Sequence, residues 1–246
     1  MENQNFNFKD PIDVQNVSSE VMSKTFVSKV FSWMFIGLGI TGFVSYLFAS
    51  TPSLIGSLMT QTTTGASMSA LGWIVMFAPL GLVLLMGAGI NKLSYPAMIG
   101  VFFVFATLMG MSLSFIFLAY TSSSIFTVFL IAAAMFGVMA VVGYTTDTDL
   151  TKFGSLMLML LVGVIIASLV NVFMHSDSFS YMISFICVAI FTGLTAYDVQ
   201  KIKRIGAQIN ADGSTTGKMA ISGALSLYLD FINLFLALLR IFGSRR

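Results

Sequence analysis

Long apolar stretches alternate with short polar separators along most of the chain. A helix needs roughly 20 predominantly apolar residues to cross the hydrocarbon core of a bilayer, and seven stretches meet that length. They are Val30–Ala49, Gly72–Ile90, Tyr95–Ala119, Ile125–Tyr144, Phe153–Met174, Phe179–Val199 and Met219–Ile241. The residue-by-residue alternation of a membrane β-barrel is absent, and a segment in lipid must satisfy its own backbone hydrogen bonds. The pattern therefore predicts an all-α membrane protein with seven transmembrane helices.

The composition agrees with this prediction and excludes a soluble globule. Hydrophobic residues make up 57% of the chain and charged residues 9%, whereas soluble domains have about 25% charged residues. The 246 residues fit one bundle, which predicts a polar cytoplasmic N-terminal tail (residues 1–27) and a transmembrane domain (residues 28–246). The net charge of +2, without a basic patch, gives no support for nucleic-acid binding. The single Cys187 and single His175 predict neither a disulfide nor a metal or cofactor site.

The positively charged residues indicate how the chain is oriented. Lysine and arginine occur in the tail and in the second, fourth and sixth loops, and none occurs in the first, third and fifth loops. The positive-inside rule therefore places the N-terminus in the cytoplasm. Seven crossings then put the C-terminus outside, although Arg240, Arg245 and Arg246 lie there. A seventh segment that enters the bilayer and returns would instead leave both termini inside, and the sequence leaves both arrangements open.

Two carboxylates lie within the predicted spans, whereas the other acidic residues fall in tails or loops. These two residues are Asp198 and Asp230. An ionisable residue in hydrocarbon costs about 2.5–3.5 kcal/mol on insertion scales and is by default a functional candidate. Asn233 and Ser226 share a helix face with Asp230, and such a polar stripe must face protein or water. The stripe predicts that the seventh helix is central to the bundle, with Asn171 of the fifth span as a further polar partner.

Asp198 lies near the cytoplasmic end of the sixth span and allows two interpretations. It can pair with Lys201 three residues later on the same helix, or it can face Asp230. At 1.5 Å per residue, Asp230 lies about 17 Å beyond Lys218, so it is much deeper than Asp198. The carboxylates meet only if the seventh helix begins a turn or two earlier than its apolar stretch, or if water reaches inward.

If the two carboxylates meet, their chemistry is well defined. Neighbouring carboxylates in a low-dielectric site cannot both ionise, and they titrate as a pair. When protonated, Asp198 and Asp230 share a hydrogen bond that holds their helices together. When deprotonated, they repel each other and offer oxygen ligands that suit a hard cation such as Ca²⁺, bound transiently. This chemistry is that of a pH-gated cation pathway.

The C-terminal part of the chain closely resembles the signature motifs of the Bax inhibitor-1 family, also called the transmembrane Bax inhibitor motif family. The resemblance covers nearly the whole chain after the tail, and its C-terminal motifs are specific. The matching segments are Gly193–Lys203 and Leu225–Gly243 (LSLYLDFINLFLALLRIFG). Two further segments resemble the bacterial inner-membrane branch of the family, namely Gly143-Tyr144-Thr145-Thr146 with Asp149-Leu150, and Ala167–Asn171.

The resemblance implies seven helices with the last at the centre, a pH-sensitive Ca²⁺ leak without a cofactor, and Asp198 with Asp230 as the pH-sensing pair. It also implies a bacterial inner-membrane location, with the lipid bilayer and a membrane-bound protease as partners. Some members carry charged residues in the second span. This chain has none between Gly72 and Ile90, so a latch of that kind is not expected.

Two other classes of function remain as alternatives. Intramembrane aspartyl proteases also share a proton between two aspartates, and Tyr197-Asp198 fits the first half of their motif. Tyr228-Leu229 precedes Asp230 instead of their Gly-x-Gly, so we expect a protein that is not an enzyme. A non-conducting membrane regulatory protein is the second alternative. In that case replacing the aspartates changes stability or partner binding but leaves ion flux unaffected.

Overall fold

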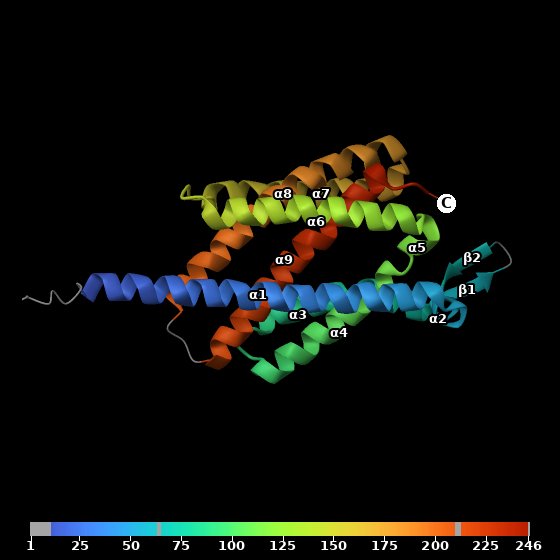
Figure 1. Cartoon of the computed structure of the whole chain (residues 1–246). Coiled ribbons are helices and arrows are strands. Elements are labelled where there is room, and N and C mark those ends of the chain that lie inside the picture. Colours follow the sequence, from blue (N-terminus) through green and yellow to red (C-terminus); the bar gives the residue numbers. More distant parts are fainter. Residues whose placement is uncertain (1–10, 63–64, 210–212, 246) are drawn as a thin grey trace, which may run out of the picture.

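The computed structural model describes residues 11–62, 65–209 and 213–245 as a helical bundle (Figure 1). Seven helical segments of this part of the chain are long and apolar enough to cross a membrane, as predicted. The long helices are α1 (Pro11–Ser50), α3 (Ala70–Gly89), α4 (Tyr95–Leu113), α6 (Ser122–Thr145), α7 (Thr151–Met174), α8 (Asp177–Gln208) and α9 (Gly213–Phe242). The short helix α5 (Ile116–Ala119) completes the third span after α4.

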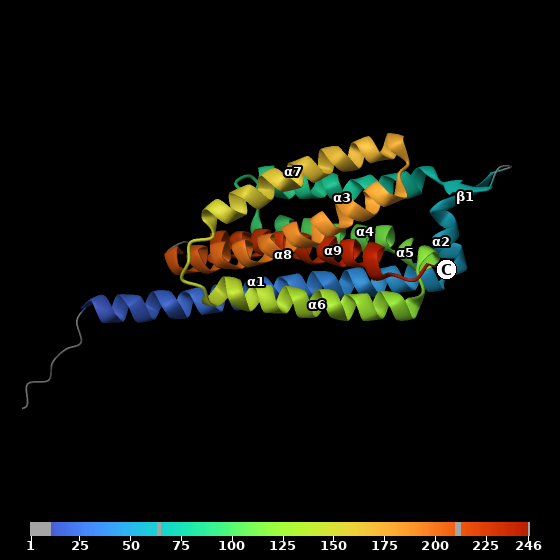
Figure 2. The same ribbon diagram turned by 90° about the horizontal axis from the view of Figure 1, so that it is seen from above.

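Helix α1 continues without interruption through the predicted boundary between tail and transmembrane domain at residues 27 and 28. Its first turns project beyond the rest of the bundle in both overall views (Figures 1 and 2). Residues 1–10 lie outside the described part of the chain. The helix begins at Pro11, a residue favoured at the first helical position, and ends immediately before Thr51-Pro52, because the residue before a proline disfavours helical geometry.

The first loop contains regular structure that hydropathy did not predict. Helix α2 (Pro52–Ser57) is followed by strands β1 (Met59–Thr62) and β2 (Gly65–Met68). The strands pair antiparallel, with Met59 opposite Met68 and Thr60 opposite Ser67. β-branched threonine favours strands, and a hairpin needs no long apolar run. A search for apolar spans therefore treats this segment as a loop.

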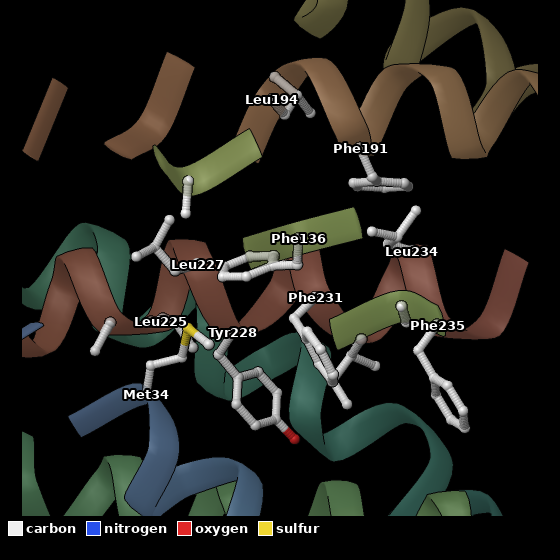
Figure 3. Close-up of a cluster of buried hydrophobic side chains, with 14 of the residues drawn as sticks. Met34, Phe136, Phe191, Leu194, Leu225, Leu227, Tyr228, Phe231, Leu234 and Phe235 are labelled. Atoms are coloured by element: carbon white, nitrogen blue, oxygen red, sulfur yellow. The ribbon is translucent and has the colours of Figure 1, made fainter. Parts of the chain in front are cut away.

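Helix α9 is the centre of the bundle, as the polar stripe predicted. In its most apolar window 61% of the residues are buried, against 6% in α7, and α9 packs on α8, α1, α6 and α4. Figure 3 shows its aromatic residues among side chains from the surrounding helices, including Phe136 of α6 and Phe191 of α8. The buried Tyr228 hydroxyl lies 2.8 Å from Thr41 Oγ1, and Thr41 Oγ1 donates to Ala106 O. Tyr228 is therefore the donor to Thr41, and the chain of hydrogen bonds joins α9, α1 and α4.

Two glycines allow helices to approach α8 closely. A Cβ added to Gly143 of α6 would overlap the backbone of Ala196, whose Cα would lie 2.7 Å away. A Cβ added to Gly154 of α7 would overlap the ring of Tyr197. Small residues at such positions let membrane helices pack by van der Waals contact. This packing fixes the C-terminal half of α8, which carries Asp198.

Candidate functional site

Asp198 and Asp230 line one cavity of about 550 Å³ between α3, α4, α7, α8 and α9. Helix α9 begins at Gly213, well before its apolar stretch begins at Met219. The extension amounts to about one and a half turns, and the middle of α9 lies beside the C-terminal part of α8. Of the two interpretations left open by the sequence, the structure has the geometry in which Asp198 and Asp230 face a common space.

The two carboxyl groups differ in environment. Asp230 is only 5% exposed, and its Oδ2 has no hydrogen-bond partner among the described residues. Asp198 is half-buried. Neither of the two ion pairs in the described part of the chain involves Asp198, and Lys201 Nζ lies 5.9 Å from the ring centroid of Tyr197. Asp198 is therefore not held in an ion pair with the lysine of its own helix.

Polar side chains occupy one side of the cavity and apolar side chains the rest. Ser226 and Asn233 of α9 line it together with the two aspartates. Asn233 Nδ2 donates to Leu229 O at 2.8 Å within the same helix. Its side-chain oxygen is thus the atom available to a ligand. The apolar lining residues are Met76, Pro79, Leu80, Val83, Phe105, Met109, Leu158, Leu161, Ile165, Phe191, Leu194 and Leu229.

A second cavity of about 140 Å³ adjoins the first at Asp198 and Ser226, which line both. Lys201 and Ser222 add polar groups to this smaller cavity, and Phe26 of α1 closes part of its wall. Asp198 therefore lies at the junction of two hollow regions. Asp230 lies deeper, in the larger region alone.

Asn171 lies elsewhere and does not line either cavity. Its Nδ2 donates to Ser180 Oγ at 2.5 Å, and its Oδ1 accepts from the backbone N–H of Ser176 at 3.3 Å. These bonds fix the turn between α7 and α8, at the opposite end of α8 from Asp198. The turn ends α7 at His175, which is exposed and has a left-handed backbone conformation with φ of 51°. Asn171 thus stabilises a turn and is not a partner of Asp230.

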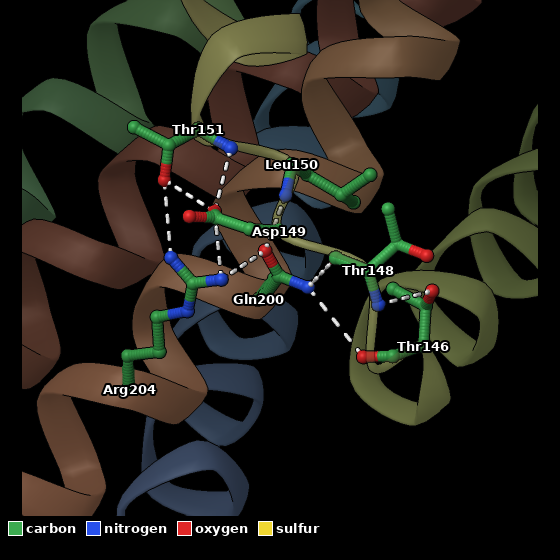
Figure 4. A network of polar contacts seen from close by, with 7 residues as sticks. All are labelled: Thr146, Thr148, Asp149, Leu150, Thr151, Gln200 and Arg204. Carbon is green, nitrogen blue, oxygen red and sulfur yellow. Dashed lines mark hydrogen bonds and ion pairs between the residues drawn. The ribbon is translucent and has the colours of Figure 1, made fainter.

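A polar network at the C-terminal end of α8 was not recognised in the sequence (Figure 4). We call it the loop latch: Gln200 and Arg204 of α8 with residues 146–151, which include the loop between α6 and α7. Gln200 Nε2 donates to Thr148 O at 2.8 Å, and its Oε1 accepts from the Leu150 N–H at 2.9 Å. The sequence signals were the polar Gln200 two residues after Asp198 and the family-like segment that contains Thr146 and Asp149-Leu150. The latch fixes α8 next to the carboxylate at the cavity junction.

Asp149 supplies the charged part of the loop latch. Its carboxylate pairs with Arg204 at 2.8 Å and accepts hydrogen bonds from the side chain and backbone of Thr151 at 2.6 and 2.9 Å. The hydrogen bonds from Thr151, followed by that from Arg204, lower the pKa of Asp149 to about 2. Asp149 is therefore ionised at neutral and mildly acidic pH.

The donor set around Asp198 and Asp230 fits a weakly held hard cation. No group of three or more His, Cys, Asp or Glu side chains that could hold a metal occurs among the described residues. Ca²⁺ takes six to eight oxygen ligands, whereas this cavity offers two carboxylates, one amide oxygen and one hydroxyl. A Ca²⁺ ion here would keep part of its water shell. Such a site suits a cation in transit better than a tightly bound structural ion.

Comparison with known proteins identifies the family. The model of the family described as "Inhibitor of apoptosis-promoting Bax1" matches residues 23–246. The inner membrane protein YbhL of Escherichia coli K12 is 43% identical over 224 residues, which are 91% of this chain and 93% of that protein. An uncharacterized protein of Borreliella burgdorferi is 42% identical over 236 residues, 96% of this chain and 99% of its own. An uncharacterized membrane protein of Streptococcus pyogenes is 39% identical over 227 residues, 92% of this chain and 95% of its own. With seven membrane-spanning helices and these relatives, the chain belongs to the Bax inhibitor-1 family of integral membrane proteins.

Proposed function

We propose that this protein is a pH-sensitive leak for Ca²⁺ or another cation across a bacterial inner membrane, with its N-terminus in the cytoplasm. Asp198 and Asp230 form the gate, and the protein is not an enzyme. The observation that carries the proposal is the shared cavity of about 550 Å³ beside the central helix α9, in which Asp230 Oδ2 lacks a partner among the described residues. A buried ionisable group in a membrane protein is by default part of a substrate or ion pathway.

The proposed path runs through the two adjoining cavities. A cation enters the smaller cavity beside Lys201, passes Asp198 and Ser226, and reaches Asp230 in the larger cavity. Further along α9 the apolar side chains Leu234 and Leu238 are almost completely buried. This apolar packing closes the path on the side away from Lys201. The geometry is that of a closed form, so conduction requires α9 and its neighbours to separate there.

Protonation controls the gate because few other charges face the pair. The lining residues from α3, α4 and α7 are all apolar, and so is Phe26 of α1. Lys201 of α8 is the charged residue that lines the smaller cavity with Asp198. When both carboxylates are ionised they repel each other and attract a cation; when protonated they can hydrogen-bond and hold α8 against α9. Cation flux therefore rises as the pH rises.

The test measures Ca²⁺ entry into liposomes that carry the purified protein and a Ca²⁺-sensitive dye. Entry is measured between about pH 6 and 8, and entry into wild-type liposomes is expected to rise with pH as the pair loses protons. Asp198→Asn and Asp230→Asn are each expected to remove that pH dependence. Asp177→Asn is the matched control, because it removes an exposed carboxylate at the other end of α8, outside both cavities, and it should retain the wild-type profile.

The opposite result would favour the alternative function, a non-conducting regulatory protein such as a modulator of a membrane-bound protease. If folded wild-type protein gives no Ca²⁺ entry above protein-free liposomes at any pH, the leak is rejected. The carboxyl pair then acts on stability or on binding to another membrane protein. Proteolysis is tested with the same variants, because it requires cleavage of a helical peptide that Asp230→Asn abolishes.

A further inference from the structure

The larger cavity opens sideways on the membrane-facing surface between α3 and α7. Several residues that line it are also exposed: Met76 (47%) and Leu80 (62%) of α3, and Leu158 (47%) and Ile165 (51%) of α7. Figure 2 places α3 and α7 on the same side of the bundle, and Figure 1 places them on opposite sides of α9. Helix α3 packs mainly on α4, and α7 mainly on α8. The side opening therefore lies where the hydrocarbon chains of lipids surround the protein.

The chemistry of the cavity is sharply divided between its entrance and its base. The entrance is formed by aliphatic and thioether side chains of α3 and α7. The base holds the carboxyl groups of Asp198 and Asp230 and the side-chain oxygen of Asn233. No lysine or arginine lines this cavity within the described part of the chain. The base thus offers hydrogen-bond acceptors and negative charge, and the walls offer apolar surface.

We propose that this side cavity binds an amphipathic amine that enters from the bilayer. Its ammonium group reaches Asp230 and Asp198, and its hydrocarbon part lies against Leu80 and Leu158. An ammonium carries three donors and no acceptor, which matches a base of acceptors, and charge-assisted hydrogen bonds of this kind are the strong ones. The cavity volume of about 550 Å³ lies within the range of small-molecule sites.

A neutral hydrocarbon chain fits the same cavity less well. A lipid tail would fill the apolar entrance but would leave Asp230 Oδ2 without a hydrogen-bond partner, and an unsatisfied buried polar atom is costly. An anionic headgroup would be repelled by the two carboxyl groups. An amine-bearing amphiphile can pack its hydrocarbon part against the apolar walls and donate hydrogen bonds to the carboxyl groups at the base.

Binding is tested in proteoliposomes with an octylamine that carries a photoreactive diazirine on its chain, with the matching diazirine octanol as the uncharged control. Mass spectrometry then maps the labelled residues. The amine is expected to label Leu80 and Leu158 above the level of Val138, an exposed residue of α6 outside the cavity. Excess unlabelled octylamine should suppress that labelling, whereas the octanol should label the exposed apolar surface without preference.

Two variants separate a specific site from general partitioning into the membrane. Asp230→Asn is expected to lower amine labelling of the cavity about tenfold, because it removes the charge from the hydrogen bond, while Asp177→Asn, at an exposed position outside the cavity, leaves labelling unchanged. Leu80→Trp narrows the entrance at an exposed position and retains both acids. It should therefore lower amine labelling of Leu158, and this result can be obtained even if Asp230→Asn fails to fold. Equal labelling by amine and alcohol, or wild-type labelling in folded Asp230→Asn, would overturn the inference.

The inference rests on the proposed function in one respect only, namely that a bound amine should block cation flux. Labelling is measured without any ion flux, so the amine site and the cation leak can be rejected independently of each other. Amine-selective labelling without any Ca²⁺ entry rejects the leak and retains the amine site. Ca²⁺ entry that depends on pH, together with labelling that does not distinguish amine from alcohol, rejects the amine site and retains the leak.

Discussion

The buried carboxyl group of Asp230 is expected to lower the free energy of unfolding of the protein. Its Oδ2 is buried without a partner among the described residues, and a buried polar atom left unsatisfied costs about 1–3 kcal/mol. Asp230→Leu removes this cost, and the adjoining cavity of about 550 Å³ accommodates the larger side chain. We therefore expect the free energy of unfolding to rise by about 1–3 kcal/mol while Ca²⁺ entry is lost.

Tyr228, two residues earlier on α9, provides a matched comparison with the opposite sign. Its hydroxyl donates a buried hydrogen bond of 2.8 Å to Thr41, and a typical intramolecular hydrogen bond contributes about 0.5–1.5 kcal/mol. Tyr228→Phe keeps the ring and loses this bond, so the free energy of unfolding is expected to fall by that amount. Both variants change a polar group on the central helix, but only Tyr228 has a partner for it.

The assay is thermal unfolding of the three proteins in one detergent at about pH 8, where the proposed hydrogen bond between protonated Asp198 and Asp230 is absent. For chains of this size about 1 kcal/mol shifts Tm by about 2–4 °C, so Asp230→Leu should unfold above wild type and Tyr228→Phe below it. A lower Tm for Asp230→Leu, comparable to that of Tyr228→Phe, would show that the carboxyl group makes a stabilising contact. The aspartate would then be structural, as expected for a non-conducting membrane protein.

Three further predictions concern the packing around α8 and the loop latch. Gly143→Ala places a methyl group against the backbone of Ala196 and should lower the free energy of unfolding by about 1–3 kcal/mol, whereas Gly137→Ala, with open space around it, should leave thermal unfolding nearly unchanged. Gln200→Ala removes the buried side chain that holds the loop after α6, so amide hydrogen exchange of residues 146–151 should accelerate. Asp149 has a folded pKa of about 2, below its ordinary 3.8, so its stabilisation is present above pH 3.8 and is lost as the pH falls through about 2. The latch should therefore stay closed throughout the pH range of the flux assay, and the protection of residues 146–151 against exchange, relative to an unstructured peptide at the same pH, should fall only in strong acid.

The positions of the helices could be predicted because a helix that crosses the bilayer needs about 20 apolar residues, and hydropathy reports such stretches directly. A polar stripe around Asp230 on an apolar helix can only face protein or water, and that reasoning placed α9 at the centre correctly. Helix ends were less predictable, because α8 and α9 extend through residues 200–208 and 213–218, which are too polar to count as a span. Residues such as Lys201 and Arg204 are good helix formers, so the helices continue beyond the apolar stretch.

These extensions decide whether Asp198 and Asp230 share a cavity, which the spacing along the chain left open. The loop latch was missed for a different reason. Gln200 contacts residues about 50 positions earlier in the sequence, and neither periodicity nor composition reports such a long-range contact. The β1–β2 hairpin was missed because its strands are short and carry no continuous apolar run.

The most direct test of the account is a double-variant comparison of Ca²⁺ entry. The rate at about pH 8 is divided by the rate at about pH 6 for wild type, Asp198→Asn, Asp230→Asn and the double variant, because the repulsion that opens the proposed gate needs both carboxylates. The account predicts a ratio well above one for wild type and the same flat ratio for both single variants and the double variant. A pH response that persists in the double variant would contradict the claim that this carboxyl pair is the gate.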